Sequence, residues 1–223
     1  MYRAIFYKER VKTIWYALLA LVVSIGFAGY MMLRVSRALS LQGPEHIWIV
    51  MLQRDVIFVD MLKFVPLIIG LGFAIVQFVP ELQRKSFKLT LHLPIRASHA
   101  VGAMLLYGVV ALLVIFLPAL LLMWGYLQSV LATELWQHIV FTTIPWYMAG
   151  LAAYLLTAWV AMEPTWRMRI VDGVIALLLI RIYFLSATPE SYNGFLPELA
   201  ILTALFAPLS LISLTRFRDG RQD

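Results

Sequence analysis

Six apolar runs, each about as long as a membrane-spanning helix, constrain this chain more than any other feature of its sequence. A helix needs about 20 apolar residues to cross the ~30 Å hydrocarbon core of a bilayer. The predicted spans cover about residues 14–33, 56–79, 101–124, 140–161, 170–186 and 198–215. The sequence therefore predicts an all-α integral membrane protein with six transmembrane helices, in which residues 1–223 form a single transmembrane domain.

The composition agrees with this interpretation. Hydrophobic residues make up 62% of the 223 residues, and charged residues make up only 13%. Soluble domains carry roughly 25% charged residues, so the surplus of apolar surface here must face lipid. The chain has no cysteine, which excludes disulfide bonds, cysteine-ligated zinc and a thiol nucleophile.

Positive charges divide unequally between the two sides of the predicted bundle. Thirteen of the 18 Lys and Arg residues lie in the N-terminus, the second loop, the fourth loop and the C-terminus, and three lie in the remaining loops. Because Lys and Arg favour cytoplasmic loops, we expect a multi-pass protein of the cell (inner) membrane with both termini in the cytoplasm. The charge follows the loops rather than one soluble face, so we expect no nucleic-acid partner.

Residues 2–13, with the sequence YRAIFYKERVKT, mix apolar and basic positions ahead of the first predicted span. Tyr2, Ile5 and Phe6 can share one face of a helix, with the basic residues on the rest of its surface. This pattern predicts an interfacial helix lying on the cytoplasmic leaflet. The alternative is a disordered basic tail that only orients the first span.

The loop between the second and third predicted spans contains a short basic amphipathic segment, ELQRKSFKLTLHLPIRASHA, at residues 81–100. Leu82, Ser86 and Leu89 can line one helical face, opposite the basic residues. Pro94 disfavours helix at the residue before it and ends the segment. Such a segment at a membrane edge binds either lipid headgroups or the groove of a cytoplasmic partner.

Sequence motifs for nucleotide or metal chemistry are absent. The chain contains no GxxxxGK[ST] phosphate loop, no HExxH and no GxSxG. None of the histidines has a second metal ligand at i+3 or i+4, so we expect structural or interfacial roles for His46, His92, His99 and His138.

Charged residues inside spans are costly to insert and are candidates for function. Asp60 and Lys63 are three residues apart, so they share a helical face and can form an ion pair. The alternative is a pair near the outer interface, with Lys63 reaching towards water. Arg181 falls in the fifth predicted span and should face a partner helix or a water-filled vestibule. These three residues are the candidates for a transport path.

The order of these elements resembles that of ABC-2-type permeases, the membrane subunits of ATP-binding-cassette transporters. The resemblance rests on Glu81 soon after the second span, FKLTLHLPIR at 87–96, AIFYKERVKTIW at 4–15 and the six-span count. It implies that residues 81–96 form a coupling helix seated in a cleft of a separate ATPase subunit. The residues that would couple to the ATPase are Glu81, Arg84, Lys85, Phe87, Leu91, Pro94 and Arg96.

The resemblance also implies a homodimer, or a heterodimer with a second permease chain, that exports an unidentified substrate. ATP and Mg²⁺ would bind the partner ATPase, and this chain would hold no cofactor and carry no enzymatic activity of its own. Two other function classes stay open. One is a non-transporting membrane scaffold or assembly subunit, and the other is an intramembrane lipid-modifying enzyme, which would need polar side chains clustered at one depth.

Overall fold

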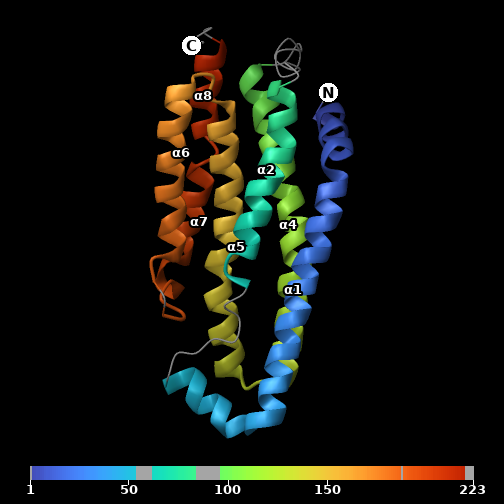
Figure 1. The fold of residues 1–223 in the computed structure, drawn as a ribbon, viewed down its shortest axis with the longest axis vertical. Helices are drawn as coiled ribbons and strands as arrows, with labels where there is room; N and C mark the ends of the chain where they lie inside the picture. The colour runs from blue at the N-terminus through green and yellow to red at the C-terminus, as the bar shows by residue number, and fades with distance from the viewer. Residues whose placement is uncertain (1, 54–61, 84–95, 187, 219–223) are drawn as a thin grey trace.

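The computed structural model describes residues 2–53, 62–83, 96–186 and 188–218, and these residues form helices joined by turns, with no β-strand among them (Figure 1). The α-helices are α1 (Tyr2–Gln53), α2 (Val65–Gln83), α4 (Ala97–Val130), α5 (Thr133–Met162), α6 (Trp166–Arg181), α7 (Leu196–Leu205) and α8 (Leu209–Arg218). Two short 3₁₀ helices, η2 (Ile182–Phe184) and η3 (Asn193–Phe195), lie between α6 and α7.

Five segments within the described residues are long and apolar enough to cross a membrane. They are Tyr2–Leu41, Val65–Gln83, Ala97–Val130, Thr133–Met162 and Asn193–Arg216. The outward faces of the helices are apolar as well: Trp15 is 80% exposed, Val22 70% and Leu177 68%. Exposed apolar surface on this scale is stable against lipid rather than water, so the protein is a multi-pass membrane protein.

The predicted fifth span differs most from the structure. The sequence predicts a span at 170–186, but α6 has 16 residues and ends at Arg181, whereas a spanning helix needs about 17–25 residues. The sixth predicted span, 198–215, is interrupted where α7 ends and α8 begins, by a turn at residues 206–208 that contains Pro208. Proline lacks the backbone N–H that would continue the helix, which accounts for this break.

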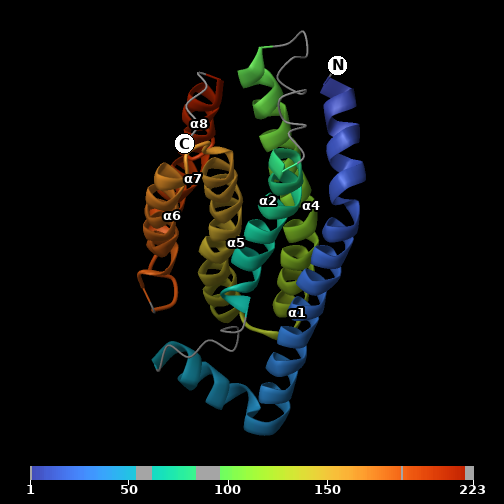
Figure 2. The ribbon, with the colours of Figure 1, turned by 45° about the horizontal axis from the view of Figure 1, so that its top comes forward.

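The helices run side by side along one axis (Figures 1 and 2). The start of α1 and the end of α8 lie at the same end of the bundle, which we call the terminal end. The end of α2, the start of α4 and the α5–α6 connection also lie there (Figure 1). At the opposite end α1 bends at Gly43, whose φ of 75° is open to glycine but rarely adopted by other residues.

The separate interfacial helix predicted at 2–13 is not formed. Helix α1 continues from Tyr2 into the apolar segment without a break at Thr13. One face of the first turns of α1 packs within the bundle, since Ile5 is buried and the ring of Phe6 lies 5.6 Å from that of Tyr107 on α4, whereas Tyr2 and Tyr7 are exposed.

Helix α5 is the central helix, with contacts to α2, α4, α6, α7 and α8. Its closest neighbour is α2, and glycines allow the approach. A Cβ atom added to Gly70 would lie well inside contact distance of the Gly150 carbonyl oxygen, and one added to Gly150 would lie 2.6 Å from the Pro66 carbonyl oxygen. Small residues at such a crossing let two backbones pack closely, which is a common source of helix association in membranes.

Candidate functional site

The last turn of α2 is joined to α1 by ion pairs at the terminal end. Glu81 is buried, with 3% of its surface exposed. Its Oε1 atom lies 2.5 Å from Nζ of Lys8 and 2.9 Å from Nζ of Lys12. Both lysines extend from α1, so Glu81 fixes the end of α2 to the second and third turns of α1.

A second carboxylate completes this group. Glu9 is fully buried on α1, and its Oε2 atom lies 2.7 Å from Nζ of Lys12. We refer to Lys8, Glu9, Lys12 and Glu81 together as the Glu81 cluster. Two ammonium groups face two carboxylates, and this pairing offsets part of the cost of removing the acidic side chains from water. Thr13 follows one turn later, and its hydroxyl lies 2.9 Å from the Tyr107 hydroxyl of α4.

A similar arrangement holds α8 at the same end. Glu163, just after α5, is fully buried. Its Oε2 atom accepts a hydrogen bond of 2.7 Å from the Ser213 hydroxyl and lies 3.4 Å from Nη1 of Arg216, both on α8. Arg169 of α6 donates to the Glu163 backbone carbonyl at 2.6 Å, which satisfies an otherwise unpaired group at the end of α5. Glu163 thus joins α5, α6 and α8.

A polar network also crosses the middle of the bundle. The Tyr154 hydroxyl of α5 donates to Oε1 of Gln77 on α2 at 2.9 Å, and Nε2 of Gln77 donates to the Met104 carbonyl of α4 at 3.0 Å. Both side chains are fully buried and bonded to one another. The network therefore joins three helices through side chains that are bonded to one another.

Only part of the predicted coupling segment lies within the described residues. Glu81 lies in the last turn of α2, in the Glu81 cluster, and Arg96 lies exposed immediately before α4. The remaining predicted coupling residues lie outside the described residues: Arg84, Lys85, Phe87, Leu91 and Pro94. The structure therefore gives the two ends of the segment, both at the terminal end of the bundle (Figure 1).

The predicted transport-path residues are not brought together in the part of the chain that the structure describes. Asp60 lies outside it, so its pairing with Lys63 stays a prediction. Lys63 lies 5.8 Å from the ring centre of Phe64 and 5.7 Å from that of Phe184, which indicates cation–π contacts. Arg181 is exposed at the end of α6, and its facing a partner helix or a water-filled vestibule stays a prediction.

Several residues that organise the site were not identified from the sequence. Glu9 follows a basic residue and Glu163 follows an apolar one, and neither belongs to a recognisable motif. Gln77 is a single amide side chain within an apolar run. For Gln77 the useful signal was polarity inside a predicted span, since a buried polar group there must find a partner. Glu9 and Glu163 lie outside the predicted spans and carried no such signal. Across the described ranges, no group of three His, Asp or Glu residues is arranged to hold a metal ion.

Comparison with known proteins identifies no relative: no family model, no curated protein and no solved structure matches this chain.

Proposed function

We propose that this chain is the permease subunit of an ATP-binding-cassette exporter, working as a dimer with separate ATPase subunits. The observation that carries the proposal is the Glu81 cluster. Glu81 is the first residue of the proposed coupling segment, and two ion pairs tie it to α1. The ABC-2 resemblance in the sequence assigns a coupling role to this same segment, and Lys8 and Lys12 of α1 pair with its first residue.

The ends of the segment suggest how a motion would spread. Residue 83 ends α2 and residue 97 begins α4, so a displacement of residues 84–96 acts on both helices. The ion pairs of Lys8 and Lys12 with Glu81 carry the same displacement into α1. A partner that pushes on one short segment thereby moves three helices of the bundle, which is the mechanical requirement of a coupling helix.

In this proposal the ATPase binds the cytoplasmic side of the protein, which is the terminal end of the bundle. The positive charge of both termini and of the 81–96 loop supports that orientation. ATP and Mg²⁺ bind the partner, and closure of two ATPases shifts the permease dimer between inward-open and outward-open states. Lys63, Asp60 and Arg181 remain proposed contributors to the transport path.

The test is affinity purification of the full chain from native membranes in mild detergent. We expect a stoichiometric P-loop ATPase to co-purify. Replacing Phe87 and Leu91 together by alanine should release it, because these apolar side chains are the ones proposed to enter its cleft. A matched control replaces Leu185 and Phe195, two exposed apolar residues between α6 and α7, and should retain the ATPase.

Coupling is tested separately from binding. In the reconstituted complex, Glu81→Gln should leave the ATPase bound but make its hydrolysis insensitive to the permease, because the segment then moves without pulling α1. Absence of any ATPase in the purified material would overturn the transporter proposal. A scaffold or assembly role would then be the better explanation of the basic loop.

A further inference from the structure

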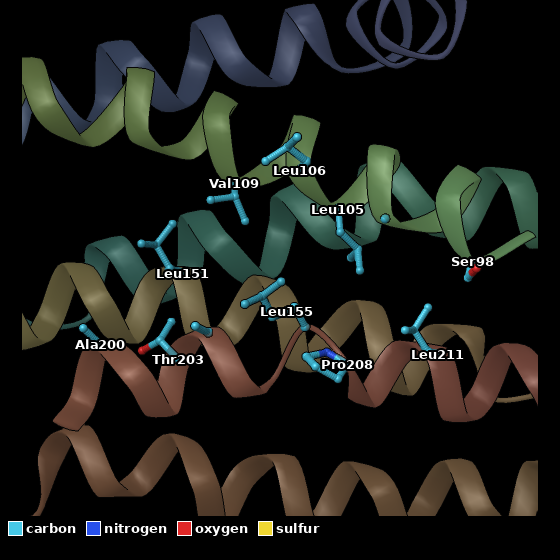
Figure 3. A pocket seen from close by; sticks show the side chains of 13 residues that line it. Ser98, Leu105, Leu106, Val109, Leu151, Leu155, Ala200, Thr203, Pro208 and Leu211 are labelled. Atoms are coloured by element: carbon cyan, nitrogen blue, oxygen red, sulfur yellow. The ribbon is translucent and has the colours of Figure 1, made fainter. Parts of the chain in front are cut away.

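An apolar groove lies between α4, α5 and the α7–α8 pair (Figure 3). Its volume is about 520 Å³, within the roughly 300–1,000 Å³ typical of small-molecule sites. Leu105 and Val109 of α4 line one wall, and Leu151 and Leu155 of α5 line the floor (Figure 3). Small residues and the turn between α7 and α8 leave the space open: Gly102, Ala200, Ala204, Ala207 and Pro208.

A second hollow continues the groove towards the terminal end. Its volume is about 380 Å³, and it shares Ser98 and Leu211 with the groove. Arg96 and Thr215 also line it, so it carries one cation and two hydroxyl groups. Helix α4 begins directly beside Arg96 without a side-chain cap, and the unpaired N–H groups of a helix start favour an anion. Thr203 lines the other end of the groove, but its hydroxyl is bonded to the Tyr183 hydroxyl and the Leu199 carbonyl. The positive charge of the combined site is therefore confined to the terminal end.

The depth of the two parts matches half of a bilayer. Ser98 and Val109 mark the ends of the groove on α4, and they lie ~16 Å apart along the helix. One leaflet contributes ~15 Å to the hydrocarbon core. Arg96 precedes the apolar run of α4, which starts at about residue 101, so it lies at headgroup depth. The site is basic where headgroups lie and apolar where one acyl chain lies.

A second copy of this chain fits the groove less well. An apolar helix of a second copy would leave Arg96, at the head of the site, without an anionic partner. A single acyl chain is narrow enough to enter, and the positive end complements a phosphate.

We propose that this groove binds one acyl chain of an anionic membrane phospholipid whose phosphate lies against Arg96 and Ser98. The inference does not depend on the transporter proposal, since it uses neither the ATPase nor residues 84–95. Its physical basis is the combination of apolar burial along the groove with charge complementarity at its head.

The experiment places the purified full chain in lipid nanodiscs that contain a photoactivatable phospholipid. Two probes carry the same diazirine-bearing acyl chain, one on phosphatidylglycerol and one on phosphatidylcholine. Labelled peptides are then mapped by mass spectrometry. We expect labelling along the groove near Leu106, Val109 and Ala204, with phosphatidylglycerol favoured about fivefold, the effect of one basic residue at a lipid surface.

Gly102→Leu is the decisive variant. A Cβ atom at Gly102 meets nothing within 4 Å, so the added side chain extends into the groove without a clash at its base. It should reduce labelling by both probes at least fivefold. Gly125→Leu, on the same helix, also meets nothing within 4 Å of its Cβ and does not line the groove, so it should label like the parent chain.

Arg96→Gln should remove the preference for phosphatidylglycerol while the label stays in the groove. The control Arg3→Gln also removes an exposed cation from the terminal end, and it should keep the preference for phosphatidylglycerol. Three outcomes would overturn the proposal: equal labelling by the two probes in the parent chain, undiminished labelling of a folded Gly102→Leu variant, or groove peptides cross-linked mainly to another copy of the chain. Unfolding temperatures confirm that each variant is folded. ATPase retention is scored separately, so failure of one proposal is distinguishable from failure of the other.

Discussion

Lys12 and Glu81 are 69 positions apart in the sequence, yet Nζ of Lys12 lies 2.9 Å from Oε1 of Glu81. This ion pair joins the first helix to the end of the second beneath a largely apolar bundle. The ion pair makes the start of α1 part of the bundle. It also attaches the start of α1 to Glu81, the first residue of the proposed coupling segment.

A double-mutant cycle measures this relationship. Lys12→Met and Glu81→Gln should each lower the unfolding temperature, and the pair should show a coupling free energy of about 0.5–3 kcal/mol. The physical reason is that each single change removes one of the two opposite charges that face the remaining group, since Glu81 keeps Lys8 and Lys12 keeps Glu9. Thermal unfolding in detergent gives the free energies. Arg10→Met, an exposed cation two residues before Lys12, should be additive with Glu81→Gln, and additivity of the Lys12 pair as well would contradict the coupling.

The α2–α5 crossing depends on glycine. Gly70→Ala places a Cβ atom against the Gly150 backbone, and backbone yields less easily than a side chain. We expect a loss of about 1–3 kcal/mol of stability from overpacking. Gly26→Ala is the matched control, because nothing lies within 4 Å of its Cβ and alanine favours helix over glycine by about 1 kcal/mol. Equal unfolding temperatures for the two variants would argue against close backbone packing at Gly70.

The buried network at Gln77 should respond to the loss of one hydroxyl. Tyr154→Phe keeps the ring but removes the donor to Gln77 Oε1, leaving a buried acceptor unpaired at a cost of about 1–3 kcal/mol. Tyr7→Phe removes a hydroxyl from a side chain that is 70% exposed, and it should be neutral. Unfolding midpoints of both variants test this, and a neutral Tyr154→Phe would show that the hydroxyl contributes nothing to helix association.

Helix α8 should loosen when Glu163 loses its hydroxyl partner. Ser213→Ala removes the 2.7 Å hydrogen bond to the carboxylate, and hydrogen bonds to charged groups contribute about 1.5–3 kcal/mol. Hydrogen–deuterium exchange of α8 should rise while that of α2 stays unchanged. Ser210→Ala is a close control on the same helix, since the buried Ser210 hydroxyl has no hydrogen-bond partner. Faster exchange in that variant too would point to a general packing effect.

The absence of native cysteine allows the topology to be tested directly. Single cysteines at Arg3 and Thr215 should react with an impermeant maleimide only from the cytoplasmic side in oriented vesicles, because both positions lie at the terminal end. A cysteine at Ser191, exposed in the turn after α6, should react only from the other side. Labelling of Ser191→Cys and Arg3→Cys from the same side would contradict the six spans predicted from the sequence and the proposed orientation.

The helical, membrane-embedded character of the chain could be predicted from the sequence because it depends on local quantities. Runs such as 101–124 are long and apolar whatever their neighbours are, and this prediction was confirmed at the level of fold class and multi-pass architecture. The sequence-based prediction was less accurate where contacts with other helices determine how a segment folds. Residues 2–13 have the pattern of an interfacial helix, but Ile5, Glu9 and Thr13 pack against other helices, so the helix continues into the bundle.

The candidate site shows the same division. Hydropathy and charge predicted that Glu81 begins a basic loop on one side of the membrane, because both properties depend only on the order of residues in the chain. The partners of Glu81, the pairing of Glu163 with α8 and the groove between α4 and α7 depend on contacts between residues far apart in sequence. Hydrophobicity specifies which surfaces leave water, but lipid and protein interiors are equally apolar. Side-chain shape, glycine positions and a few buried polar pairs therefore select which helices meet, and these appear only once the chain is folded.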